Sequence, residues 1–437
     1  MSRPPGETPR TYRLMYIGRS SAQIERDFGE RLSRLMREGF EVHVLAGDDG
    51  GFGALAERGV VVKPIPVDRR LNVVGLMGAY FIVQAYFIEQ RPVLVHAFDD
   101  VLAWLGALAA ERAYTEAIVV TVERHVLVDD PVRLELDTVL PVPPTLFERL
   151  EALLNNVAGD SIRNSFVRAY AYLGGLVDKY CVINEHDFQA LQNLRIVEPD
   201  KLEMLIGGNG VDLEEFNLED DAFPSVGEAR SELGVPGNWR WVLGYHGPLT
   251  LARGASDLIE CIERLAKTHP AAGWLVGLEP TPGKASSSKV MLGRLERLER
   301  TGRVKIVREP AEARLFYRAL DLYVNPSYRE GAPTHLMQAA AAGVSAVAYH
   351  LPATQTVIEH GQTGDLLPRG EVDALVEAIR RSLDEPRRLE TYGVRARGRA
   401  VRKFSRQHVE DQVFRMYDTV LETRLHRPDA PHGSDNP

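Results

Sequence analysis

The stretch DLYVNPSYREGAPTHLMQAAAAGVSAVA, residues 321–348, decides the fold of this chain. It contains a short apolar strand at 322–325, a polar loop, a helix expected at 334–342 and a second apolar strand at 345–348. A strand, a crossover helix and a second strand in this order form a right-handed βαβ unit with parallel strands. The stretch therefore predicts an α/β fold built on a parallel sheet.

The same alternation extends outward over most of the 437 residues and stops and restarts near the middle of the chain. It predicts two doubly wound Rossmann-like domains that face a cleft. The expected boundaries are 11–213 for an N-terminal domain, 129–165 for an insertion in it, 405–424 for a C-terminal helix that completes it, 214–404 for a C-terminal domain, and 1–10 and 425–437 for flexible tails.

The composition narrows the class of protein. Lys and Arg number 52 against 61 Asp and Glu, a net charge of −9, which argues against nucleic acid as the main partner. With 44% hydrophobic residues the chain is typical of globular proteins. Two cysteines, Cys181 and Cys261, exclude a disulfide framework and a thiolate zinc site, and favour a reducing compartment. Residues 1–10 lack the apolar core of a secretory signal.

One apolar stretch, VVGLMGAYFIVQAYFI at 73–88, has two interpretations. Its 16 residues are fewer than the roughly 20 that a membrane-spanning helix needs. It is therefore either a buried helix or a helix that contacts a membrane face. Lys63, Arg69 and Arg70 precede it and would suit an anionic membrane surface.

Ligands of open parallel sheets bind beyond the carboxyl ends of the strands, so the residues that follow strands are candidates for a site. Gly247 and Gly254 bracket a loop that could bring backbone N–H groups and Arg253 to a phosphate, although an ordinary loop would look the same. Glu330 precedes a helix start at which an anion would be stabilised, and could bind sugar hydroxyls or simply cap the helix.

Two further segments are open to a functional or a structural interpretation. Asn209 and Gly210 lie in the run GGNGVD at 207–212, which allows close backbone approach or a hinge turn. Glu123 and His125 follow a strand, and His125 could carry a proton or be structural. The chain has no phosphate-binding G-x-x-x-x-G-K-[ST] loop, and no His or Cys spacing in it is typical of a metal site.

In order along the chain, these segments resemble the family 4 glycosyltransferases of the GT-B architecture, over roughly residues 11–424. Residues 326–348 are similar to the family block in which two glutamates are separated by seven residues; Glu330 takes the first place and Gln338 the second. Arg253-Gly254 corresponds to the family's Lys-Gly pair, while Pro248 stands where the family has an arginine. Three further matches are the N-G-V-D run at 209–212, the G-x-T-G turn at 361–364 and the strand at 321–327.

The resemblance implies a retaining, metal-independent transfer from a nucleotide-sugar, with no cofactor besides this donor. Arg253 and Glu330, with His125, would be catalytic: Arg253 would hold the diphosphate, and Glu330 would orient the sugar. The implied donor-binding residues are Gly247, Gly254, Asn209, Gly210, Gly331, Ala332 and Gln338, of which Gln338 would bind the ribose.

The N-terminal half is similar to the branch of the family that builds surface polysaccharides on lipid carriers. This likeness implies a UDP-sugar donor, a glycan or polyprenyl-diphosphate-linked acceptor, and a place in the cytoplasm at the inner face of the cell membrane. Ser20, His96 and Glu123 would lie on the acceptor side. The alternative is a catalytically degenerate homologue that acts as a partner or glycan-binding subunit, since Pro248 and Gln338 depart from the family pattern.

Overall fold

The computed structural model describes residues 12–67, 73–122, 159–205, 208–217, 223–279, 286–308 and 312–425. The chain forms two compact units, each built on its own sheet. Unit 1 contains residues 1–183, 187–205 and 410–437, and unit 2 contains 184–186 and 206–409. The change from one unit to the other falls at Leu205/Ile206, eight residues before the boundary expected from the sequence.

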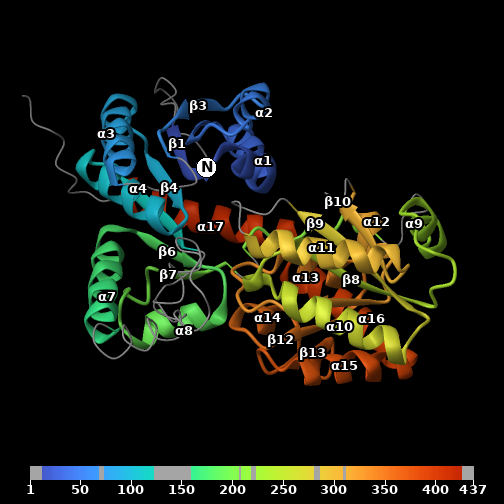
Figure 1. The fold of residues 1–437 in the computed structure, drawn as a ribbon. Coiled ribbons are helices and arrows are strands. Elements are labelled where there is room, and N and C mark those ends of the chain that lie inside the picture. The colour runs from blue at the N-terminus through green and yellow to red at the C-terminus, as the bar shows by residue number, and fades with distance from the viewer. Residues whose placement is uncertain are drawn as a thin grey trace, which may run out of the picture. The chain divides into compact units, whose positions relative to one another are not determined.

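Unit 1 has a seven-stranded parallel sheet in the order β3-β2-β1-β4-β5-β6-β7 (Figure 1). Its elements are β1 (Tyr12–Ser20), α1 (Ser21–Arg37), β2 (Phe40–Gly47), α2 (Phe52–Glu57), β3 (Val61–Pro64), α3 (Val73–Gln90), β4 (Leu94–Phe98), α4 (Asp100–Arg112), β5 (Ala117–Val122), α7 (Gly159–Leu176), β6 (Lys179–Val182), α8 (Glu185–Asn193), β7 (Leu202–Met204) and α17 (Arg406–Leu425).

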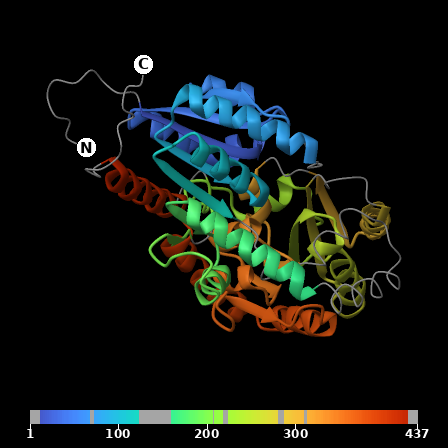
Figure 2. The ribbon, with the colours of Figure 1, turned by 90° about the vertical axis from the view of Figure 1, so that its left-hand side faces the viewer.

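Helices cover both faces of this sheet because alternate strand residues point to opposite sides. Met15 and Ile17 pack with α3, α4 and α7, whereas Leu14 and Tyr16 pack with α1 and α17. Helices α3 and α4 lie side by side on the first of these faces (Figure 1 and Figure 2). Of the expected insertion 129–165, residues up to 158 lie outside the described part of the chain, and 159–165 belong to α7.

Unit 2 has a six-stranded parallel sheet in the order β10-β9-β8-β11-β12-β13. Its elements are α9 (Val226–Glu232), β8 (Trp241–Pro248), the 3-10 turn η1 (Leu251–Arg253), α10 (Ala255–Thr268), β9 (Ala272–Glu279), α11 (Ser286–Arg300), β10 (Val304–Arg308), α12 (Ala313–Arg318), β11 (Leu322–Asn325), α13 (Thr334–Ala341), β12 (Ser345–Tyr349), α14 (Pro352–Val357), β13 (Gly364–Leu367), α15 (Val372–Asp384) and α16 (Pro386–Lys403).

Unit 2 is also doubly wound. Helices α10, α11 and α15 share one apolar core, and α12, α13 and α16 share a second one on the other face. The two units together confirm the α/β, doubly wound fold that the sequence predicts. Cys181 and Cys261 are both buried as free thiols, one in each unit.

Helix α17 is fixed to unit 1 by a buried ion pair. Glu410 accepts two hydrogen bonds from Nε of Arg31, at 2.9 and 3.0 Å, and the two side chains are only 9% and 2% exposed. One position further along, Asp411 pairs with Arg34 at 3.0 Å, but these side chains are 39% and 31% exposed. Removing one partner of a buried pair leaves an uncompensated charge, whereas an exposed pair contributes little.

We therefore expect Glu410→Ala to lower the free energy of unfolding of unit 1 by about 3–5 kcal/mol. The matched variant Asp411→Ala is on the same helix and should cost at most about 1 kcal/mol. Urea denaturation followed by circular dichroism measures both. Equal effects of the two variants would contradict the importance of burial for this contact.

Candidate functional site

The candidate site lies where the strand order of unit 2 reverses. The chain runs from β8 outward to β9 and β10, then returns to place β11 on the other side of β8. Loops leave the carboxyl ends of two such neighbouring strands in different directions, which opens a crevice for a ligand. In unit 2, the two loops at this reversal are the loop from β8 to α10 and the loop from β11 to α13.

These two loops touch each other through their backbones. Gly254 has a φ of +71°, and a Cβ on it would lie 1.9 Å from the carbonyl oxygen of Pro326. The backbone N–H of Tyr328 donates to the carbonyl of Ala252 at 3.0 Å. The Tyr328 hydroxyl also donates to Asp257, in the first turn of α10, at 2.8 Å. A residue with a side chain would not fit at 254, so glycine is required here for close approach as well as for its backbone angle.

The contact brings Arg253 and Glu330 together as an ion pair between Nη1 and Oε2. Glu330 is 6% exposed, and its other oxygen lies 3.3 Å from Nδ2 of Asn325, which donates to it. Arg253 is 34% exposed. Although burial opposes the charge of Arg253, Glu330 raises the pKa of its guanidinium above the ordinary range. A fixed cation with donors near solvent suits binding of an anion such as a phosphate.

Beside this pair lies a cluster that the spacing of residues does not predict. It consists of His246 in β8, Glu279 at the end of β9, Tyr317 in α12 and His335 in the first turn of α13. The Tyr317 hydroxyl is 3.0 Å from Nδ1 of His246 and 3.1 Å from Nδ1 of His335. Nε2 of His335 is 3.3 Å from Glu279.

Electrostatics in this cluster favour a charged carboxylate and a neutral buried imidazole. The hydrogen bond from His335 lowers the pKa of Glu279 to about 2. Burial, with the neighbouring His335, lowers the pKa of His246 to about 3. The sequence offers one signal for the cluster, which is that Glu279 ends strand β9 and His335 begins the helix that follows strand β11.

The remaining donor-side predictions fall at several places in unit 2. Gly247, with a φ of +148°, is the residue before the last one of β8. Gly331 and Ala332 are half-buried in the loop that carries Glu330. Gln338 lies on α13 with its Oε1 3.3 Å from Nδ1 of His335, so this side chain already has a protein partner. The implied contact of Gln338 with a ribose stays a prediction.

The N-G-V-D run is fastened to the connection between α16 and α17. The N–H of Val211 donates to Phe404 at 2.6 Å, and Asp212 pairs with Arg406 at 3.1 Å. Gly210 has a φ of +69°, and a Cβ on it would lie 2.8 Å from the backbone of Arg406. Asn209 is half-buried next to this turn. These contacts support the structural interpretation of the run.

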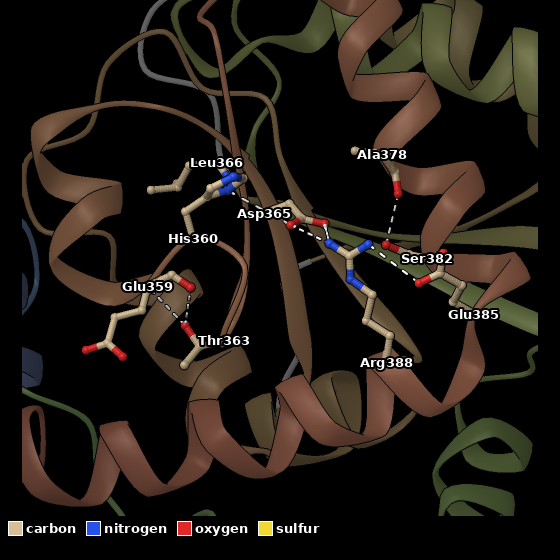
Figure 3. Close-up of polar contacts among 9 residues, drawn as sticks. All are labelled: Glu359, His360, Thr363, Asp365, Leu366, Ala378, Ser382, Glu385 and Arg388. Atoms are coloured by element: carbon tan, nitrogen blue, oxygen red, sulfur yellow. Dashed lines mark hydrogen bonds and ion pairs between the residues drawn. The ribbon is translucent and has the colours of Figure 1, made fainter.

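The G-x-T-G turn at 361–364 sets up strand β13 (Figure 3). The Thr363 hydroxyl accepts a hydrogen bond from the backbone N–H of Glu359 at 2.8 Å. Next along the chain, Asp365 pairs with Arg388 through both of its oxygens at 2.8 Å. Through Asp365, this outer strand of the sheet is held to α16.

On the acceptor side, the structure places His96 where it has no exposed surface. His96 lies in β4, with Nε2 2.7 Å from the hydroxyl of Thr121 and Nδ1 hydrogen-bonded to Tyr417 of α17. Burial lowers its pKa well below the ordinary 6.5. A side chain in this position cannot touch an acceptor directly. Ser20 is the N-cap of α1 and accepts from the N–H of Gln23 at 2.9 Å. Glu123 and His125 lie outside the described residues.

Residues 240–385 match the protein-family model for glycosyl transferases group 1. This part of the chain is a group 1 glycosyl transferase domain. The matched range contains the paired loops, with both Arg253 and Glu330. The family resemblance inferred from the block at 326–348 is therefore confirmed.

Two curated relatives illustrate the likeness. The capsular polysaccharide biosynthesis glycosyltransferase CapM of Staphylococcus aureus is 24% identical over 214 residues, which are 49% of this chain and 53% of CapM. The lipopolysaccharide core biosynthesis mannosyltransferase LpsB of Rhizobium meliloti is 23% identical over 215 residues, 49% of this chain and 60% of LpsB. The chain thus spans little more than half the length of the curated relatives it matches.

Solved glycosyltransferase structures resemble the whole fold. The structure of Anabaena Alr3699/HepE in complex with UDP and glucose has a TM-score of 0.71 at 17% identity, and the match covers 93% of this chain and all of that one. At this identity the likeness concerns the fold alone. It identifies the two doubly wound units as the GT-B architecture, as the sequence predicts.

The close approach at Gly254 leads to a prediction on stability. Gly254→Ala adds left-handed strain of about 1–2 kcal/mol and an overlap with Pro326 that should cost about 1–3 kcal/mol more. Gly302 is the matched control, because its φ is +72° and a Cβ on it would have no neighbour within 4 Å. Gly302→Ala should therefore cost the strain alone. Thermal unfolding of unit 2 in both variants provides the test, and equal losses would contradict a steric role for Gly254.

Proposed function

We propose that the chain is a retaining glycosyltransferase that moves a sugar from a UDP-sugar to a glycan or polyprenyl-diphosphate-linked acceptor. The observation that carries the proposal is the Arg253–Glu330 pair at the strand reversal of a glycosyl transferase group 1 domain. CapM is named for capsular polysaccharide biosynthesis and LpsB for lipopolysaccharide core biosynthesis, which supports a glycan acceptor. The UDP of the HepE complex supports a uridine donor.

The proposed chemistry depends on negative charge at the leaving diphosphate. As the glycosidic bond breaks, this charge would be stabilised by the guanidinium of Arg253 and by the N-terminal end of α13, so transfer needs no metal and no cofactor besides the donor. Glu330, held by Arg253 and Asn325, would accept hydrogen bonds from hydroxyls of the donor sugar. Gln338 can still donate from its amide nitrogen to a ribose hydroxyl while its oxygen faces His335.

We expect Arg253→Ala to lower the rate of UDP release from the preferred UDP-sugar by about a hundredfold or more, since one fixed donor to the leaving group is lost. Arg380→Ala is the control: Arg380 is a surface arginine on α15 that pairs with Glu377, and its loss should change nothing. Because Arg253→Ala also leaves Glu330 without its charged partner, the thermal midpoint of each variant is measured alongside. Normal turnover by folded Arg253→Ala protein would contradict the proposal.

A second candidate function is binding of donor or glycan without transfer. It is favoured by Gln338, a neutral side chain at the second glutamate position, and by Pro248 in place of a cation. Calorimetry with UDP separates the two candidates. Binding of UDP that Arg253→Ala weakens, together with no turnover of UDP-glucose, UDP-galactose or UDP-N-acetylglucosamine by the wild type, would favour the degenerate homologue.

We further propose that α3 contacts the inner face of the cell membrane. Its inner side buries Ala79, Val83 and Phe87, while Met77, Phe81 and Ile88 are 56%, 60% and 55% exposed. Apolar residues on both sides distinguish α3 from an ordinary surface helix. Nζ of Lys63 lies 5.6 Å from the ring centre of Tyr86, a residue near the C-terminal end of α3. Arg69 and Arg70 lie outside the described residues. Among the described helices, none is long and apolar enough to cross a membrane.

The double variant Phe81→Glu and Ile88→Glu should reduce co-sedimentation with vesicles that contain anionic phospholipid, because it places two carboxylates on the proposed contact face. The matched control is Val394→Glu and Val401→Glu on α16, two exposed valines with the same spacing of seven residues. The control should sediment like the wild type. Membrane contact through α3 would be refuted by equal sedimentation of all three proteins.

A further inference from the structure

The cluster beside the Arg253–Glu330 pair has the donor atoms of a metal site. Ligand atoms of His246, Glu279 and His335 all lie within 4.8 Å of one another. The proposed transfer uses none of these three side chains. We propose that they form a binding site for one divalent transition-metal ion, of which Zn²⁺ fits the donor set best.

The geometry is close to what a metal requires. Zinc bonds to imidazole nitrogen and carboxylate oxygen are about 2.0–2.2 Å long, so tetrahedral ligand atoms lie about 3.3 Å apart. The distance between His335 Nε2 and Glu279 Oε1 is already 3.3 Å. Glu279 is 41% exposed and is the last residue of β9, so its carboxylate has room to rotate toward His246. Three protein ligands leave a fourth position for water or an anion.

Tyr317 holds both imidazoles in the orientation that a metal site needs. Its hydroxyl oxygen can accept a hydrogen bond from Nδ1–H of His246 at 3.0 Å and from that of His335 at 3.1 Å. Oε1 of Gln338, at 3.3 Å, is a second acceptor for His335. When Nδ1 carries the proton, the lone pair is on Nε2, which is the atom that would bind the metal. Tyr317 is fully buried, which fixes the position of its hydroxyl.

The donor set also predicts which ions bind. Two imidazoles and one carboxylate suit Zn²⁺ or Co²⁺, whereas Mg²⁺ and Ca²⁺ prefer sites made of oxygen ligands. The two thiols of the chain do not compete for zinc, because Cys181 and Cys261 are buried and burial raises the pKa of each to about 12. Metal binding can be measured without any donor or acceptor, so this inference does not rest on the proposed function.

The test uses the full chain, free of any affinity tag and stripped of metal with a chelator. Zn²⁺ is titrated in competition with a chromophoric chelator, and the wild type should bind one equivalent at this site. His335→Ala and Glu279→Gln should weaken that binding at least tenfold. His269→Ala is the matched control, because His269 also faces a carboxylate, that of Asp384 at 3.6 Å, but among the described residues it belongs to no group of three ligands. Its affinity should equal that of the wild type.

Two further measurements separate a metal site from a purely structural cluster. Co²⁺ in place of Zn²⁺ should give the intense visible absorption of a four-coordinate site, which His335→Ala should abolish. Tyr317→Phe should keep the stoichiometry but weaken affinity by about 10–100-fold, as loss of an orienting partner does. The proposal is overturned if the wild type binds no zinc, if His335→Ala and Glu279→Gln bind it as tightly as the wild type, or if Mg²⁺ competes equally.

Discussion

The close contact between Gly254 and the carbonyl of Pro326 is the constraint on which the candidate site depends. It lets the loop after β8 and the loop after β11 touch through their backbones, with no side chain between them. Arg253 precedes the first contact residue, and Glu330 follows the second by four positions. The ion pair between them is thus a consequence of backbone packing at the strand reversal. The strand order of the parallel sheet places the two loops next to each other, and the absence of a Cβ at Gly254 allows their backbones to touch.

The pairing of Arg253 with Glu330 also sets the electrostatic balance of the site. Glu330 is almost fully buried and needs a positive neighbour, because an isolated buried carboxylate is costly. Any anion that approaches Arg253 therefore competes with Glu330 for the same guanidinium. Asn325 also stabilises this carboxylate, because its amide nitrogen donates a hydrogen bond to the other oxygen of Glu330. This neutral donor would remain a partner of the carboxylate if the guanidinium of Arg253 turned toward a ligand.

The sequence predicts the bounds of a helix or strand well where a local pattern of apolar residues defines that element. Strand β11 has the expected bounds, and helix α13 and strand β12 end within one residue of theirs, because each is marked by a local run or repeat of apolar residues. Short elements such as α2 and α14 were not expected, since six residues are too few to show a period. The sequence predicts Arg253 and Glu330 as separate candidates, but their pairing depends on contact between two loops that are more than 70 residues apart in the chain.

Contacts between residues that are far apart in the sequence account for what the sequence does not predict. His96, which the resemblance places on the acceptor side, is hydrogen-bonded to Thr121 and to Tyr417, and Tyr417 is more than 300 residues away in the sequence. The cluster of His246, Glu279 and His335 likewise joins residues from two strands and a helix, so no spacing motif describes it. In both cases the fold, through the crossover connections of a parallel sheet, brings distant residues together.

The burial of both cysteines has a practical consequence for spectroscopy on this molecule. With pKa values of about 12, the thiols of Cys181 and Cys261 are reactive thiolates in fewer than about one in a thousand molecules near neutral pH. A cysteine introduced on the surface would therefore react with a maleimide dye or spin label far faster than either native thiol. With one such label in each unit, the distance between the two labels could be measured without first replacing Cys181 or Cys261 in the cores.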